Sequence, residues 1–179
     1  MRQLPILLAA AFSLIIPAIA QMQFSLANEK PVYRVGEPIK LTWKLFNGTK
    51  RDWVVFKGTM GVRQNFPQIA FRIEAPDDRY NLSLQGDEKA TTIAACRLRP
   101  GQTLRADFDL AQWMTYLGHR TPPGDYGISA TFAHAASDYR MLQGMPVVQC
   151  GSTGPTTTAM PSEIWDGTLT APRITITLR

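Results

Sequence analysis

The feature that most constrains the fold is an alternation of apolar and polar residues with a period of two. It is clearest where Ile39, Leu41, Trp43 and Leu45 alternate with polar residues. Successive side chains of a β-strand point to opposite faces, so this pattern predicts a strand with one buried face. The pattern recurs in further runs at 69–73, 80–84, 104–108, 126–132 and 174–178.

Turn-forming sequences separate these runs, among them Asn47-Gly48, Pro100-Gly101 and Pro122-Pro123-Gly124. Gly tolerates backbone conformations that other residues avoid, and Pro fixes φ. Strands with one polar face and short turns predict antiparallel sheets packed face to face. We therefore expect an all-β fold, an antiparallel β-sandwich of about seven to nine strands. A closed barrel remains the alternative, because strand count alone does not exclude it.

One segment follows a helical period instead. Four apolar residues stand at i, i+3, i+4 and i+7: Leu110, Trp113, Met114 and Leu117. Either Asp107 or Asp109 is placed to cap the start, and Gly118 is placed to end the segment. The spacing predicts one short helix over about 109–117. We expect Trp113 to press against the open end of the sandwich; an aromatic binding stripe is the alternative.

The segment 1–20 has the pattern of an export signal. Arg2 precedes an apolar run, and Ala18-Ile19-Ala20 has the small-x-small pattern that signal peptidase cuts. We expect residues 1–20 to be removed and residues 21–179 to form a single domain, periplasmic or secreted. The apolar run is shorter than the about 20 residues that a membrane span needs. We therefore expect no transmembrane segment after cleavage.

The sequence contains two cysteines, Cys96 and Cys150. In an oxidising compartment an even count favours a disulfide, and two cysteines allow one pairing. Two buried free thiols are the alternative. A disulfide here would close a long loop, which the chain-entropy model values at about 4 kcal/mol.

The alternation fades over residues 133–166, a long loop rich in Met, Gly, Ser, Thr and Pro. Loops longer than about 15 residues inside a compact domain are usually functional or disordered. Val147-Val148 predicts a short strand beside Cys150, which would tie this loop to the strand that ends at Cys96. The candidate binding surface is this pinned loop, flanked by residues 57–63; its residues are Tyr139, Arg140, Met141 and Met145.

Four segments stand in a recognisable order: Tyr33-Arg34-Val35-Gly36-Glu37-Pro38-Ile39, Leu98-Arg99-Pro100-Gly101-Gln102, Pro123-Gly124-Asp125-Tyr126 and Trp165-Asp166-Gly167-Thr168-Leu169. In this order the chain resembles bacterial exported immunoglobulin-like β-sandwich domains of the proteinase-inhibitor-like and macroglobulin-like type. The resemblance implies an immunoglobulin-like sandwich, in which the first segment opens a strand. It also implies a tyrosine corner, with the Tyr126 hydroxyl returning to nearby backbone.

The sequence contains no recognisable catalytic or zinc-binding motif. The sequence lacks G-x-S-x-G, and its two histidines have no zinc spacing. With 19 Lys and Arg against 14 Asp and Glu, the net charge is +5, but the basic residues are scattered. We therefore expect no enzymatic activity, no cofactor and no nucleic-acid binding.

The leading hypothesis is an exported, monomeric, non-enzymatic module that presents loops to a protein or cell-envelope partner. Peptidase inhibition is a special case of it. Two alternatives remain: an accessory to an envelope enzyme, and a small periplasmic copper carrier. Copper would use His134, Met141 and Met145, because soft thioethers suit Cu(I).

Overall fold

The computed structural model of the 179-residue chain describes residues 21–59, 69–77, 79–83, 93–116, 118, 120–134, 146–151, 157–158 and 163–179. The expected signal segment 1–20 lies outside these residues. Within the described part, no helix is both long and apolar enough to cross a membrane.

The first sheet has three antiparallel strands in the order β1-β3-β8. Its strands are β1 (Met22–Asn28), β3 (Lys40–Asn47) and β8 (Thr103–Asp109). Every second residue of β3 is buried, as the alternation predicts. Lys40 and Lys44 lie on the exposed face.

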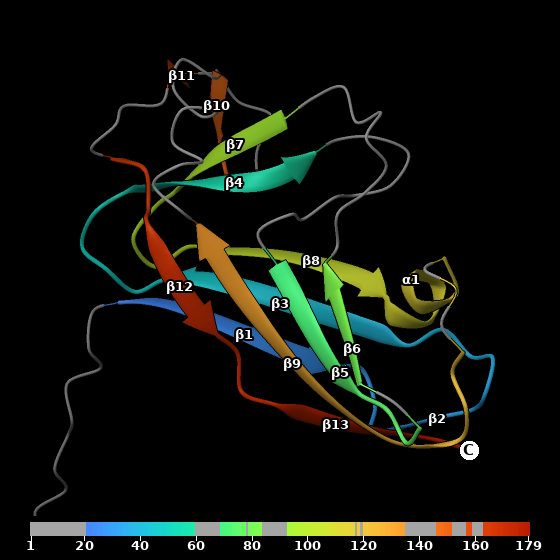
Figure 1. Cartoon of the computed structure of the whole chain (residues 1–179). Coiled ribbons are helices and arrows are strands. Elements are labelled where there is room, and N and C mark those ends of the chain that lie inside the picture. Colours follow the sequence, from blue (N-terminus) through green and yellow to red (C-terminus); the bar gives the residue numbers. More distant parts are fainter. Residues whose placement is uncertain are drawn as a thin grey trace, which may run out of the picture.

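The second sheet is larger and covers the buried face of the first (Figure 1). Its central strand β9 pairs antiparallel with β5, β12 and β13. β2 joins β13 in parallel, and β6 joins β5 antiparallel. The strands of this sheet are β2 (Val32–Tyr33), β5 (Ile69–Glu74), β6 (Arg79–Ser83), β9 (Gly124–His134), β12 (Gly167–Thr170) and β13 (Ile174–Leu178).

A third sheet lies across one end of the other two, at the top of Figure 1. Its order is β11-β10-β7-β4, and β10 runs parallel to β7. Its strands are β4 (Trp53–Thr59), β7 (Ile93–Leu98), β10 (Pro146–Gln149) and β11 (Thr157–Thr158). The expected strand at Val147-Val148 is therefore present, and it lies within the 133–166 segment.

Aromatic pairs join the first two sheets across a shared core. Phe24 of β1 lies 5.8 Å from Phe132 of β9, and Phe71 of β5 lies 4.9 Å from Phe108 of β8, between ring centroids. The predicted all-β sandwich is confirmed. The described residues form thirteen strands, because the third sheet and the two-residue strands β2 and β11 add to the alternating runs.

The predicted helix is α1 (Leu110–Tyr116), at the end of β8. Asp109 caps it: Oδ1 accepts hydrogen bonds from the backbone N–H groups of Ala111 and Gln112, at 2.9 and 3.3 Å. Asp107 instead accepts a hydrogen bond from the Thr42 hydroxyl. Trp113 is half-buried and packs against the core, as expected.

The disulfide between Cys96 and Cys150 is present, with Sγ atoms 2.04 Å apart. Both residues are buried, and the bridge joins β7 to the residue that follows β10. Beside it, a hydrogen bond with Glu163 raises the pKa of the Arg97 guanidinium. The disulfide thus ties β10 to β7 within the third sheet, and the ion pair of Arg97 with Glu163 ties the segment before β12 to the same sheet.

The tyrosine corner is also present. The Tyr126 hydroxyl donates a hydrogen bond to the backbone carbonyl of Pro122 at 2.6 Å, and the side chain is buried. The turn that precedes β9 is thereby fixed to the core.

Candidate functional site

The four residues of the sequence-predicted binding surface lie outside the described residues: Tyr139, Arg140, Met141 and Met145. The structure places the two ends of that segment in different sheets, with His134 ending β9 and Pro146 beginning β10. Of the flanking residues 57–63, only 57–59 are described, as the end of β4. That surface stays a prediction.

His134 is the described residue of the copper hypothesis. Its side chain continues the inward phase of β9 and is buried, at 2% exposure. It pairs in register with Gly167 of β12. Among the described residues, no group of three or more His, Cys, Asp and Glu is arranged to hold a metal ion.

A different surface emerges where the chain passes from the first sheet to the second and back. Residues 29–39 leave β1, form the short edge strand β2 and return to β3; we call them the braced loop. A pocket of about 720 Å³ opens beside this loop. It is lined by Lys30, Val32, Tyr33, Arg34, Val35, Gly36, Glu37 and Arg179.

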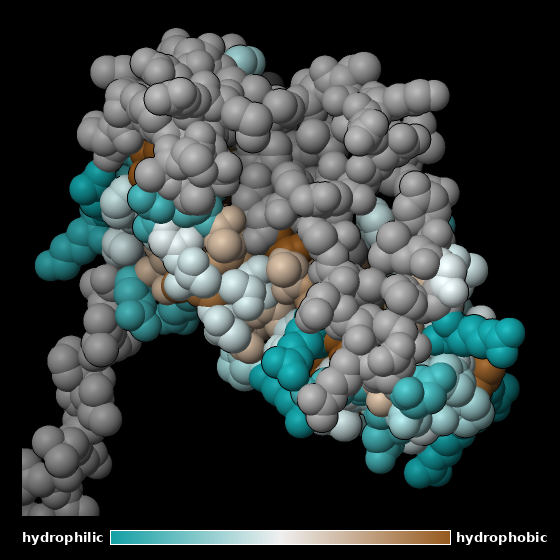
Figure 2. Space-filling model, in the orientation of Figure 1, coloured by the Kyte–Doolittle hydropathy of each residue, from teal (hydrophilic) through white to brown (hydrophobic). Residues whose placement is uncertain are grey.

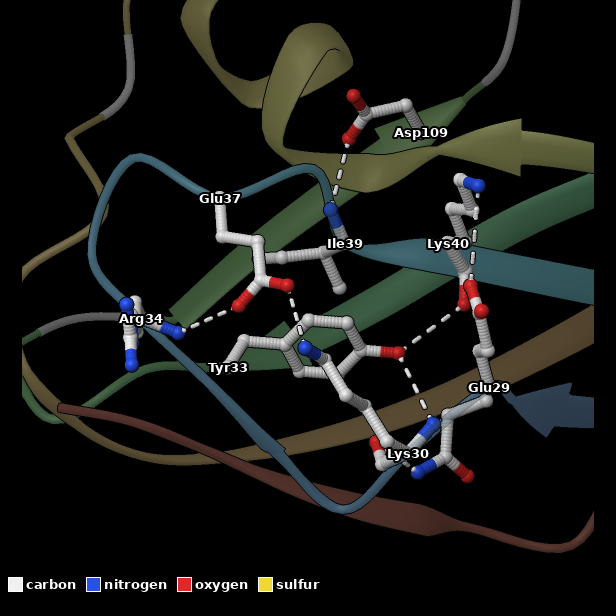
Figure 3. Close-up of polar contacts among 9 residues, drawn as sticks. Glu29, Lys30, Tyr33, Arg34, Glu37, Ile39, Lys40 and Asp109 are labelled. Atoms are coloured by element: carbon white, nitrogen blue, oxygen red, sulfur yellow. Dashed lines mark hydrogen bonds and ion pairs between the residues drawn. The ribbon is translucent and has the colours of Figure 1, made fainter.

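Glu37 closes the loop on itself (Figure 3). Its carboxylate accepts hydrogen bonds from the ammonium group of Lys30 and, at 2.9 Å, from the backbone N–H of Arg34. The Glu37 N–H in turn donates to the Arg34 carbonyl at 3.0 Å, and Gly36 supplies the positive φ of 84° that the turn requires. The bond from Lys30, followed by the bond from Arg34, lowers the pKa of Glu37 below its ordinary value of 4.5.

Tyr33 anchors the braced loop to the core. Its ring is buried, and its hydroxyl donates to the Lys40 carbonyl while it accepts from the Lys30 N–H, both at 3.3 Å. The Lys30 ammonium lies 5.0 Å from the centre of the Tyr33 ring, a favourable cation–π distance. Lys30 is therefore held by an ion pair, a hydrogen bond and an aromatic ring.

The braced loop is also attached to both sheets. On the side of β13, Arg179 N–H donates to the Tyr33 carbonyl at 2.9 Å, and Val35 N–H donates to the Arg179 carbonyl at 3.0 Å. On the side of β3, Ile39 N–H donates to the same Asp109 carboxylate that caps α1, at 3.0 Å. These bonds give the loop a fixed backbone at the edge of the sandwich.

The outer surface of this rigid loop is apolar and basic. Val32 and Val35 are 42% and 50% exposed, and they are the exposed large hydrophobic side chains among the described residues. Arg34 and Arg179 are also exposed, and no ion pair within the described part of the chain involves either guanidinium. Figure 2 shows hydrophilic side chains gathered at this end of the molecule, near the C-terminus marked in Figure 1, with hydrophobic surface between them.

From the sequence, segment 33–39 was expected only to open a strand, and no binding role was predicted for it. The signal that was missed is the spacing of Val32 and Val35 around a turn that also contains Arg34 and Glu37. Two valines three residues apart fit neither the period of a strand nor a helix that Pro38 would interrupt. Apolar residues in such a turn have no obvious buried partner, which indicates exposure.

Comparisons with known proteins return no matching family model and no matching curated protein. Two solved structures align over most of the chain. The CARDB domain of a protein from Pyrococcus furiosus is 12% identical with a TM-score of 0.36, and the alignment covers 88% of this chain and 94% of that one. The sporulation control protein Spo0M from Bacillus subtilis is 10% identical with a TM-score of 0.39, covering 89% of this chain and 50% of Spo0M.

Proposed function

We propose that the protein is an exported, non-enzymatic binding module that contacts a partner protein through the braced loop. The observation that carries this proposal is the exposure of Val32 and Val35 on a loop whose backbone is fixed at both ends. Exposed apolar side chains lose water when a partner covers them. A loop that is already ordered pays little conformational entropy on binding.

Two further features support the exported location within this proposal. The Cys96–Cys150 disulfide is typical of proteins that fold in an oxidising compartment. The apolar segment 1–20 has the pattern of an export signal. The copper alternative depends on Met141 and Met145 as well as His134, and the two methionines lie outside the described part of the chain. Peptidase inhibition is a special case of the same kind of binding module.

The proposal is tested by capture from cell-envelope extract. Val32→Ser together with Val35→Ser removes the apolar surface, and because both residues are exposed we expect stability to change by only about 0.5 kcal/mol. A matched control is Ala70→Ser together with Ala133→Ser, which removes exposed apolar surface from the outer face of the second sheet.

We expect the wild type and the control to retain the same partner and the Val32/Val35 variant to lose at least about nine-tenths of it, a tenfold change that corresponds to about 1.4 kcal/mol. Equal retention by all three proteins would contradict the proposal, because the braced loop would then contribute nothing to binding. Thermal melting of each variant distinguishes lost contact from lost folding.

A further inference from the structure

The charges around the pocket restrict the chemistry of a partner, if the braced loop is the binding surface as proposed above. Side chains of three cations line it: Lys30, Arg34 and Arg179. The one carboxylate side chain in the lining, Glu37, already accepts hydrogen bonds from Lys30 and from the Arg34 backbone. Neither guanidinium group, of Arg34 or of Arg179, forms an ion pair with a described residue, although Arg34 and the Glu37 carboxylate attract each other at longer range.

The apolar part of the surface lies among these cations. Val32 and Val35 flank Arg34 in the chain, and the Val35 N–H is bonded to the Arg179 carbonyl, so the valines and both arginines share one edge. A complementary ligand therefore needs carboxylates next to a small apolar group. Arg in particular presents a planar fork that matches a carboxylate with two parallel hydrogen bonds.

We propose that this pocket binds an acidic segment of a partner protein. Its carboxylates would face Arg34 and Arg179, and an apolar side chain would cover Val32 and Val35. Glu37 then has a second role besides bracing the loop. It is an internal competitor that keeps Lys30 neutralised, so that the free protein does not present three unpaired cations at one place.

The same features favour a protein segment over a membrane surface. Recognition of anionic lipid by sequence-readable clusters typically uses about four to eight Lys and Arg residues. The pocket instead offers two arginines that form no ion pair with a described residue, the carboxylate of Glu37 and two valines on a fixed backbone. Such a small and mixed surface suits a few specific side-chain contacts.

Fluorescence anisotropy of labelled peptides with the full exported chain tests the ligand class. The probes are alternating Asp-Leu, Ser-Leu and Lys-Leu peptides of equal length. We expect the Asp-Leu peptide to bind at least about fivefold more tightly than the other two, as one or two exposed charge pairs allow. Equal affinity for all three peptides would overturn the proposal.

Single variants locate the effect. Arg34→Gln and Arg179→Gln should each weaken Asp-Leu binding severalfold and leave Ser-Leu binding unchanged. The control is Arg105→Gln, an exposed arginine on β8 of the first sheet. Loss of the same size in the control would overturn the proposal, because binding would then reflect net charge alone.

Glu37→Gln tests the competitor role. The glutamine amide oxygen can still accept the hydrogen bond from the Arg34 N–H, while Lys30 loses its counter-charge. We expect Asp-Leu affinity to rise severalfold, and the added Lys30→Gln change to remove that gain. An affinity that stays level or falls would overturn the competitor role.

Two outcomes separate this inference from the proposed function. If capture of a native partner depends on Val32 and Val35 but the acidic peptide has no advantage, the ligand class is wrong and the binding surface stands. If vesicles of phosphatidylglycerol and phosphatidylcholine bind more tightly than the Asp-Leu peptide and Arg34→Gln abolishes that binding, the assignment to a protein segment is wrong.

Discussion

At the scale of single residues, Glu37 determines the shape of the braced loop because its carboxylate joins Lys30 to the Arg34 backbone. Both bonds favour the charged form of the carboxyl group, so they lower the pKa of Glu37 below its ordinary value of 4.5. A carboxylate whose pKa is lowered by folding stabilises the folded state above its unfolded pKa. That contribution is lost as the pH falls through the folded pKa.

The expected result is an acid transition local to the loop. An NMR titration should show the Arg34 amide proton shifting with a midpoint below pH 4.5, because that amide donates to the titrating carboxylate. Glu37→Gln should abolish this transition, whereas Glu29→Gln, a change at an exposed neighbour, should leave it in place. A midpoint at or above 4.5 would mean that the Lys30 and Arg34 bonds do not form in solution.

At the scale of secondary-structure elements, Asp109 connects three parts of the fold. Its Oδ1 caps α1 through Ala111 and Gln112 and also accepts the Ile39 N–H at the end of the braced loop. Sequence spacing left Asp107 and Asp109 as equal candidates for the cap. The structure resolves the choice because Asp107 faces Thr42 of the neighbouring strand.

Asp109→Ala should therefore lower the free energy of unfolding by about 1–2 kcal/mol, the usual cost of a lost N-cap. Asp107→Ala, which removes a solvent-exposed hydrogen bond, should change it by only about 0.5 kcal/mol. Urea unfolding followed by circular dichroism measures both. Equal effects of the two changes would show that Asp109 has no special role as the cap.

The strands that could be predicted from the sequence are those with one face exposed to solvent. The run from Ile39 to Leu45 and the run in β9 show the alternation because their other face meets water. β4 was missed, since its adjacent residues Val54 and Val55 are both buried and give no period of two. β1 also alternates, with Met22, Phe24 and Leu26 buried, although it is not among the predicted runs.

At the scale of the whole molecule, the disulfide ties β7 to the distant segment that contains β10, within the third sheet. The sequence predicted the pairing of Cys96 with Cys150, because two cysteines allow one bridge. It did not predict that β10 would run parallel to β7 beside that bridge. Parallel pairing depends on how a long connection crosses the fold, which local sequence patterns do not encode.

Replacing both cysteines by alanine should lower the free energy of unfolding by about 4 kcal/mol, since a bridge with a sequence separation of 54 restricts the unfolded chain. Chemical reduction of the wild type should have an effect of similar size. Both are measured by urea unfolding at neutral pH. A loss below about 1 kcal/mol would mean that the β7–β10 pairing keeps the two strands together without the bridge.

The candidate site in the braced loop differs from the site predicted in residues 133–166 because it depends on the pairing of distant segments. A long irregular segment drew attention to residues 133–166, while the braced loop is short and looks like an ordinary turn in sequence. Its exposure and its proximity to Arg179 arise from the β2–β13 pairing, which joins distant parts of the chain. Such proximity follows from the sheet topology, and the spacing of residues along the sequence does not predict it.

The braced loop is the surface through which we propose that the protein binds its partner. Hydrogen exchange of the chain without residues 1–20, measured alone and in complex with the partner captured from envelope extract, is the most direct test of this proposal. We expect slower exchange on binding at residues 30–37 and 179, with no change at the outer face of β8. Slower exchange elsewhere, with the braced loop unaffected, would contradict it.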